Sequence, residues 1–547
     1  MNTTTTPRAR PERWAWRGVA RGVCALGTVW FAGHGAGWAQ SVETFGGSDA
    51  PEGLRLGGGA PDASAPSGQR SRPLEWRWNA AFTVSDNISA LPSQQGRDAG
   101  AMLRVGPGVR WVHQGGGAEW LLDYSLQAQR YAKTAALGQP FQSSLRSSAK
   151  IDLGSPAFTL EGQANIAQRT RSAFEAQRTL GESGVGESTE VGTLALGPVA
   201  RLRLGEGWRL TAQQTSTLTR ARGTTVGDAQ GSQAQISIEP GPQRRMGLGA
   251  TVTHQFTRPL EGRRTASSQG TVNLTWRPDV DWTVVARGGQ ERSNLQSVAS
   301  QTGTTYGLDA TWQPTPRTRL QLNGDQRVLG DFHTVNLEHR FARAVVRWSD
   351  SRTINQAGVV GAASGQTNYD LFFAQLATTE PDPVQRDLLV RQRLADLGLS
   401  GDAVVANGFL SSQPTVSRTR LLGVTYQQPR TLWTLNLTKT RTSRLLAGGL
   451  GSEDLASSSF VDTESAQMSW TYRLTPSQAL RAQASWQRSE GENAALQRNE
   501  LRTVLLGWAE RLTPGVQIAL GLRHSAFESP TRPFVENAVV VNVEQRF

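Results

Sequence analysis

Apolar and polar side chains alternate at every second position in many segments of this chain between residues 74 and 547. In TLWTLNLTK (431–439), Trp433, Leu435 and Leu437 share one face of an extended strand, and Thr434, Asn436 and Thr438 share the other. In GVQIALGLR (515–523), the apolar residues at 516, 518, 520 and 522 likewise share one face. A helical period would spread the apolar side chains around a cylinder, so the pattern predicts strands with two different faces. The chain is therefore expected to be all-β.

The final segment, VVVNVEQRF (539–547), has the same alternation. Val539, Val541, Val543 and Phe547 fall on one face of a strand, and the polar residues that include Arg546 fall on the other. An apolar face that ends on an aromatic ring is typical of a strand that closes a membrane barrel, with the ring at the membrane boundary. We expect Phe547 to end such a barrel-closing strand.

Turn signals and polar loops follow one another with a regular rhythm. Short turns that contain Pro or Gly occur at 277–281, 474–477 and 512–515, and longer polar segments separate them. Short turns on one side and long loops on the other are typical of an antiparallel outer-membrane β-barrel, whereas a propeller would repeat a motif in every blade. The rhythm predicts roughly 18 to 22 strands in one barrel domain over residues 74–547.

The front of the chain has the pattern of a secretory signal. A basic stretch precedes a short apolar stretch that ends in small residues at Gly37 and Ala39. An uncleaved anchor is the alternative, but the apolar stretch is interrupted by glycines and His34 and is shorter than the ~20 residues that a spanning helix needs. We expect a signal peptide at 1–39 and a flexible periplasmic segment, rich in Gly, Pro and Ser, at 40–73.

Composition excludes several other classes of protein. Hydrophobic residues make up only 37% of the chain, and no apolar run after residue 40 is long enough for a spanning helix, which excludes a helical membrane protein. A barrel stays compatible, because half of each strand faces a polar lumen. The single cysteine, Cys24, lies in the expected signal, so no disulfide framework is expected.

Tryptophan is frequent, at 17 residues, and many of these residues lie near the ends of expected strands. Amphipathic rings favour the headgroup level of a membrane, so we expect two aromatic girdles.

One segment departs from the strand pattern. Residues 355–414 form the longest insertion without an expected strand, and EPDPVQRDLLVRQRLADLGLSG (380–401) within it has helical spacing of apolar residues. We expect a helix at 383–397, with Asp382 and Pro383 suited to its start. The helix could lie outside the cell, fold into the lumen as a constriction or plug, or only cover loop backbone.

No pattern of catalytic, cofactor-binding or metal-binding residues is present in the sequence. A phosphate-binding glycine loop followed by lysine, a histidine pair with metal spacing and a G-x-S-x-G elbow are all missing. The chain is basic, with a formal net charge of +12, but its basic residues are interleaved with strands rather than gathered in a patch, so nucleic acid is not an expected partner. Alternation points several arginines into the expected lumen, where they would favour anions: Arg319, Arg481, Arg523 and Arg546.

The first expected barrel strands carry a resemblance to a known family. WRWNAAFTVSDNI (76–88), VGPGVRW (105–111) and LLDYSLQAQRY (121–131), together with the later segment around Asp382, Pro383 and Arg386, resemble the outer-membrane β-barrel proteins associated with the PEP-CTERM/exosortase system. That resemblance implies a location in the outer membrane of a Gram-negative bacterium and a non-enzymatic role in exopolysaccharide production or export.

Three functional hypotheses follow. The first is the exopolysaccharide role, the second is a general or anion-preferring porin, and a lipid-modifying enzyme of the outer membrane is a distant third. The expected partners are outer-membrane lipid and lipopolysaccharide, the barrel-assembly machinery and, through the resemblance, exopolysaccharide or its export components. No cofactor is expected.

Overall fold

The computed structural model describes residues 74–547 except 93–94, 133–139, 177–187, 206, 356, 362–368, 370–371, 374–385, 388, 392–393, 395–407 and 447–452. The expected signal peptide at 1–39 and the expected flexible segment at 40–73 lie outside these residues.

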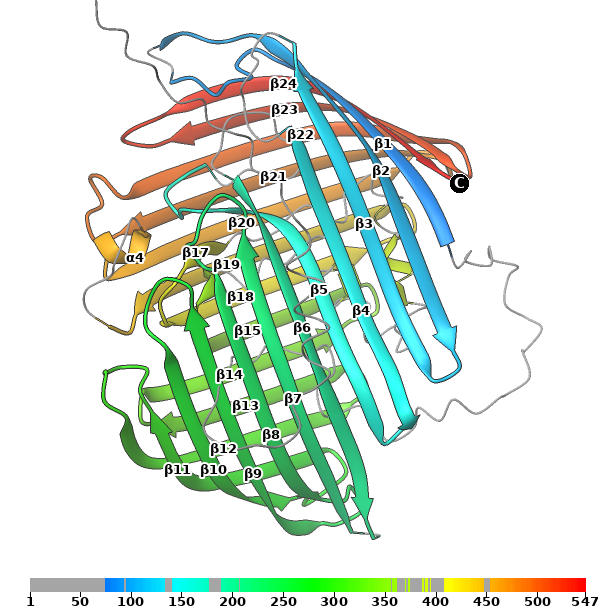
Figure 1. Cartoon of the computed structure of the whole chain (residues 1–547). Coiled ribbons are helices and arrows are strands. Elements are labelled where there is room, and N and C mark those ends of the chain that lie inside the picture. The colour runs from blue at the N-terminus through cyan, green and yellow to red at the C-terminus, as the bar shows by residue number, and fades with distance from the viewer. Residues whose placement is uncertain are drawn as a thin grey trace, which may run out of the picture. The chain divides into compact units, whose positions relative to one another are not determined.

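Among the described residues, 22 strands form one antiparallel sheet that closes on itself (Figure 1). The first fifteen are β1 (Leu74–Ser85), β2 (Gly100–Gly115), β3 (Ala118–Tyr131), β4 (Phe141–Ser155), β5 (Phe158–Thr170), β6 (Ser188–Leu204), β7 (Trp208–Ala221), β8 (Ala229–Pro240), β9 (Met246–Pro259), β10 (Thr265–Trp276), β11 (Trp282–Ser293), β12 (Gln301–Thr315), β13 (Thr318–Arg327), β14 (Gly330–Arg340) and β15 (Ala344–Asn355). The remaining seven are β18 (Thr415–Gln427), β19 (Thr431–Arg444), β20 (Phe460–Arg473), β21 (Gln478–Gly491), β22 (Arg498–Thr513), β23 (Val516–Glu528) and β24 (Phe534–Arg546).

The last strand closes the barrel against the first. β24 pairs with β1 from Arg77 opposite Arg546 to Ser85 opposite Ala538, and the Phe547 amide donates to the Trp76 carbonyl at 2.9 Å. Closure leaves no open sheet edge among these strands. An open edge would expose unpaired backbone N–H and C=O groups to the membrane interior. The prediction of an antiparallel β-barrel with 18 to 22 strands is confirmed at the upper end of that range.

The two ends of the barrel differ. One end, here called the tight-turn end, has short connections such as 116–117, 316–317 and 514–515, and the first strand begins and the last strand ends there. The opposite end, the long-loop end, has longer connections such as 86–99 and the insertion at 356–414. Among the described residues of that insertion, β16 (Gly358–Gly361) and β17 (Gly408–Ser411) form a separate two-stranded sheet.

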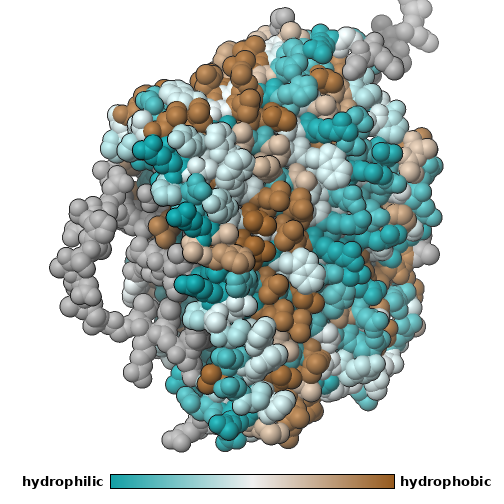
Figure 2. All heavy atoms as spheres, turned by 180° about the vertical axis from the view of Figure 1, so that it is seen from behind, coloured by the Kyte–Doolittle hydropathy of each residue, from teal (hydrophilic) through white to brown (hydrophobic). Residues whose placement is uncertain are grey.

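The alternation in sequence separates the two faces of the wall. Outward positions carry exposed apolar side chains, including Phe82 (46% exposed), Leu437 (38%) and Leu522 (57%). Inward neighbours such as Asn436 and Thr440 are buried polar residues. On the face drawn in Figure 2, the apolar residues form a brown band bordered by hydrophilic zones. A closed barrel with an apolar outer band and a polar interior is a membrane-spanning barrel of the outer-membrane type.

The tryptophans form one of the two expected girdles, at one end of the barrel. Rings from neighbouring strands meet close to the tight turns, with Trp282 and Trp312 stacked at 5.6 Å and Trp111 and Trp120 edge to face at 5.1 Å between ring centroids. Nine tryptophans of the expected girdles lie on strands at or near the tight-turn end: Trp76, Trp111, Trp120, Trp208, Trp276, Trp282, Trp312, Trp470 and Trp508. Amphipathic rings at that level fix one membrane boundary.

Loops meet across the long-loop end. The Asp454 carboxylate, in the short helix α4 (Asp454–Ser457) between β19 and β20, accepts from the Ser172 hydroxyl at 2.7 Å and from the Ala173 amide at 2.6 Å. Asn499 at the start of β22 donates to the carbonyl of Ala173 at 3.0 Å. Apolar side chains from these loops, from the β16–β17 pair and from the start of β20 form one cluster: Ala173, Val360, Phe409, Leu455 and Val461.

Candidate functional site

The insertion at 356–414 leaves β15 at the long-loop end but contacts the inner wall near the tight-turn end. Val390 and Leu394 are buried in a cluster with Tyr369, Phe372 and Leu432. Leu432 is the second residue of β19 and points inward, because its outward neighbour Trp433 is exposed. The insertion therefore enters the lumen, one of the positions that the sequence left open.

The helix expected at 383–397 is present where the structure describes it. Six residues are helical, and the two ends of the expected helix lie outside the described residues: Arg386, Asp387, Leu389, Val390, Arg391 and Leu394. Val390 and Leu394, four residues apart, are buried on one side of this helix. Asp387 and Arg391, also one turn apart, carry the charges that contact the wall.

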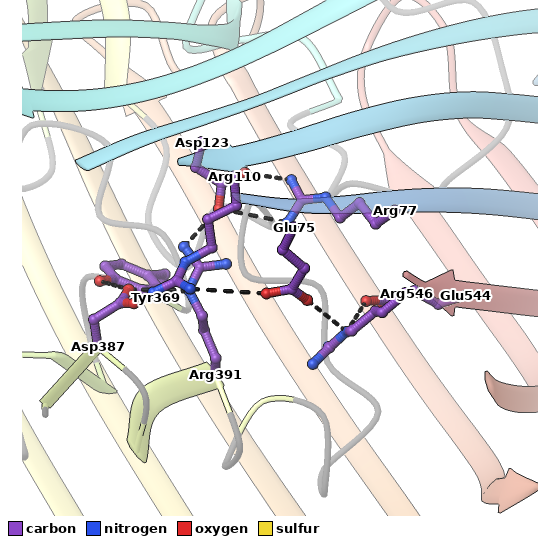
Figure 3. A network of polar contacts seen from close by, with 9 residues as sticks. All are labelled: Glu75, Arg77, Arg110, Asp123, Tyr369, Asp387, Arg391, Glu544 and Arg546. Carbon is purple, nitrogen blue, oxygen red and sulfur yellow. Dashed lines mark hydrogen bonds and ion pairs between the residues drawn. The ribbon is translucent and has the colours of Figure 1, made fainter. Parts of the chain in front are cut away.

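Asp387 is the centre of a charge network inside the barrel (Figure 3). Its carboxylate accepts from the Arg110 guanidinium of β2, from the Tyr369 hydroxyl and from Arg391 Nε at 3.0 and 3.1 Å. Asp387 is 1% exposed and Arg110 is 3% exposed. Such charges are tolerated away from water only because each is paired and hydrogen-bonded.

Arg391 extends the network to the next strand. Its Nη2 donates to Asp123 Oδ2 of β3 at 2.6 Å, and Arg77 Nη2 of β1 donates to the other oxygen of the same carboxylate at 2.5 Å. Side chains of the first three strands thus hold a helix that lies 268 positions further along the chain from Asp123. We call these five residues the latch: Arg77, Arg110, Asp123, Asp387 and Arg391.

The latch continues towards the seam where the barrel closes. Arg110 Nη1 lies 3.7 Å from the Glu75 carboxylate, and Arg546 Nε lies 3.9 Å from Glu75 and 2.7 Å from Glu544 (Figure 3). Docking of the insertion is thereby linked through Glu75 to the strand pair β1–β24.

Tyr369 gives the latch an aromatic side. The Arg146 guanidinium of β4 lies 4.2 Å from the centre of the Tyr369 ring, and the Phe373 ring stacks on Tyr369 at 5.6 Å between centroids. Burial raises the pKa of the Tyr369 hydroxyl, and the nearby Asp387 carboxylate raises it further. The phenol therefore stays protonated and donates to Asp387 across the physiological pH range.

Breaking such a network at one residue has a large effect. Removal of one partner from a buried ion pair costs about 3–5 kcal/mol, because the remaining charge loses its compensation. Charges also specify one docked position, since a shifted helix would leave several of them unmatched. The latch can therefore hold the insertion in one position against the wall.

The structure places the four arginines expected in the lumen on inward faces but does not gather them into one site. Arg523 donates to Glu536 Oε1 at 2.9 Å on the neighbouring strand, and Arg546 pairs with Glu544 and Glu75. Arg319 lies on β13 and faces away from exposed Leu322 of the same strand. Arg481 lies on β21 next to Gly507 of β22. Pairing with carboxylates reduces the anion preference expected from Arg523 and Arg546.

Part of the inner wall is neutral and polar. Inward positions of β7 to β10 carry amides and hydroxyls that bond to one another, such as Gln213 to Gln235 at 3.3 Å and Asn273 to Thr251 at 2.9 Å. We call this surface the neutral wall, and its inward residues include Gln213, Thr215, Gln233, Gln235, Thr251, Thr253, Gln269 and Asn273. Each of these amide and hydroxyl side chains can both donate and accept hydrogen bonds.

Sequence reasoning missed the wall half of the latch. Asp387 and Arg391 stand four residues apart on an expected helix, which is a visible signal, but Arg110 and Asp123 resemble any other inward charge of a barrel strand. No group of three or more His, Cys, Asp or Glu residues that could hold a metal ion occurs in the part of the chain that the structure describes. Within the same residues, no helix has the length and apolar character needed to cross a membrane.

No protein-family model matches the chain, and neither does any curated protein sequence. Solved structures with a similar course of the chain include the siderophore receptor PirA from Pseudomonas aeruginosa, at 9% identity and a TM-score of 0.40 over 88% of this chain and 81% of that chain. The FrpB iron transporter from Neisseria meningitidis matches at 11% identity and a TM-score of 0.45, over 87% and 82% of the two chains. OpdK from Pseudomonas aeruginosa matches at 10% identity and a TM-score of 0.32, over 87% and 99%. At these values the similarity supports no inference about substrate.

The protein is an outer-membrane β-barrel, on the grounds of its own closed sheet, apolar outer band and aromatic girdle.

Proposed function

We propose that this barrel is a non-enzymatic conduit that supports the production or export of an exopolysaccharide, with the insertion at 356–414 as its plug. The observation that carries the proposal is the contact of Asp387 and Arg391 with Arg110 and Asp123, which holds a loop from one end of the barrel against the inner wall near the other end. Loops and helices plug the lumen of many large outer-membrane barrels.

The chemistry of the inner wall supports a hydroxyl-rich cargo. Sugar hydroxyls both donate and accept hydrogen bonds, and the amides and hydroxyls of the neutral wall match them without a fixed charge. A polymer passing such a wall can exchange one weak contact for the next, which permits movement as well as binding.

The sequence resemblance to PEP-CTERM-associated barrels supports the same direction. The segments that carry the resemblance, 76–88, 105–111 and 121–131, lie in or next to β1, β2 and β3. These strands also provide the wall side of the latch. Export of a polysaccharide needs a wide pore that is closed when no polymer passes, and a docked plug meets that need.

A general or anion-preferring porin is the second candidate. The inward positions of Arg319 and Arg481 favour it, because cationic rings and patches select anions in pores. The docked insertion favours the conduit with a plug, since a general porin must stay open to small solutes.

A deletion strain separates the two candidates. We expect loss of secreted polysaccharide with unchanged uptake of small solutes, and we expect rescue by the intact gene. Unchanged polysaccharide together with reduced uptake of small anions would replace the proposed function by the porin. A strain that expresses the barrel without residues 362–407 should secrete polysaccharide but lose its barrier to large antibiotics.

A further inference from the structure

Charged side chains occupy outward positions on one side of the barrel, where lipid-facing residues would otherwise continue. Two rows run across β15, β18, β19 and β20 in strand register: Asp350 lies opposite Arg420, Arg420 opposite Lys439, and Lys439 opposite Glu464. In the second row Arg418 lies opposite Arg441, which lies opposite Asp462. We call these seven residues the outer charged band.

The band lies on the outer face and not in the lumen. Leu422 and Leu437 stand two positions nearer the tight-turn end on the same faces of β18 and β19, and Leu437 is exposed. A charge at the centre of a bilayer costs ~2–4 kcal/mol on a barrel face, and the cost falls to nearly nothing at the interface. The band therefore marks the headgroup level on the long-loop side of the apolar band.

The ion pairs within the band turn its cations outward. Asp350 accepts from Arg418 Nε at 3.0 Å and Nη2 at 2.7 Å, and from Arg420 Nε at 3.2 Å. The Asp350 side chain is 12% exposed, whereas those of Arg418 and Arg420 are 44% and 50% exposed. Lys439 and Arg441 are exposed by 56% and 54%, more than their partners Glu464 and Asp462. The less exposed carboxylates hold the cations in position, and the charged groups of the cations remain exposed on the outer face.

We propose that the outer charged band binds the phosphate groups of lipid A, the lipid anchor of lipopolysaccharide. Lipid A carries its phosphates at one end of its acyl chains. The phosphates can contact Arg420 and Lys439 while the acyl chains contact Leu422 and Leu437, two positions nearer the tight-turn end. Side chains opposite each other on neighbouring strands are about 5 Å apart, so Arg420 and Lys439 can hold one phosphate between them. A guanidinium has five N–H donors, so its pairing with one carboxylate leaves capacity for phosphate oxygens.

The test measures binding of fluorescent lipid A to the purified full-length barrel in detergent micelles. The variant is Arg420→Gln with Lys439→Gln, and the matched control is Arg258→Gln with Arg292→Gln, which removes two exposed cations from β9 and β11. Each cation near an anionic lipid surface contributes on the order of 1 kcal/mol, so the variant should bind roughly thirtyfold more weakly. The control should bind like the natural chain, and all proteins should keep the gel shift of a folded barrel on heating.

Three further probes decide the chemistry. Lipid A without phosphates should bind the natural chain as weakly as lipid A binds the variant, and phosphatidylglycerol and inorganic phosphate should compete poorly. Equal binding of phosphate-free lipid A, or equal affinity of the variant and the natural chain, would overturn the proposal. Strong competition by phosphatidylglycerol would also overturn it, because the band would then recognise anionic lipid in general, and competition by inorganic phosphate alone would indicate a site for free anions.

Discussion

Asp387, on a helix that enters the barrel from the long-loop end, accepts a hydrogen bond from Arg110 on β2, a strand that lies 277 positions earlier in the chain. Both side chains are almost completely buried. This pair connects the insertion, the proposed plug, to the barrel wall. Substitution of either residue should therefore change how often the pore is open.

Asp387→Asn should release the insertion. The substitution keeps the shape of the side chain but removes the charge that pairs with Arg110 and Arg391, which weakens docking by about 3 kcal/mol, or more than a hundredfold in the docking equilibrium. Planar bilayers with the variant should show frequent openings of high conductance. Asp279→Asn, in an exposed turn between β10 and β11, is the matched control and should conduct like the natural chain.

Leu437→Arg tests the assignment of the two faces of the wall. Leu437 faces lipid between the midplane and the outer charged band, so an arginine there should destabilise the barrel by ~1–2 kcal/mol, whereas Thr438→Arg, which faces the lumen, should cost much less. Unfolding by guanidinium in lipid vesicles measures both variants. A larger loss for Thr438→Arg would mean that the register is shifted by one residue.

Gly197→Ala should disturb the β6–β7 pair. A Cβ atom at Gly197 would lie 1.6 Å from the Gln214 carbonyl oxygen, and backbone atoms cannot move away without breaking the ladder. Gly270→Ala on β10 is the control, because no atom lies within 4 Å of a Cβ placed there. The fraction of folded barrel in the outer membrane should fall for the first variant and stay unchanged for the second.

The barrel could be predicted from the sequence because its main signal is local. In segments such as 431–439, period-two alternation assigns each residue to lipid or lumen, and Pro- or Gly-containing turns separate the strands. Closure of β24 on β1 followed from the apolar face of 539–547. The same local signal places tryptophans near strand ends without saying which end of the barrel each one occupies, so the gathering of nine of them at one end could not be predicted.

The latch could not be predicted because its partners are far apart in the chain. The spacing of Asp387 and Arg391 indicates a charged helix face, but the choice of Arg110 and Asp123 as partners depends on how the insertion enters the lumen. The same limit applies to Arg523 and Arg546. Their inward direction follows from alternation, whereas their pairing with Glu536 and Glu544 depends on strand register.

The conductance of a barrel without the insertion tests most directly whether the insertion closes the pore. Gly361 of β16 already lies opposite its register partner Gly408 of β17, so a two-residue Asn-Gly turn can join them after deletion of residues 362–407. The shortened barrel should keep its gel shift on heating and form a steadily open channel of high conductance, while the natural chain stays mostly closed. Equal conductance of the folded shortened barrel and the natural chain would contradict the account.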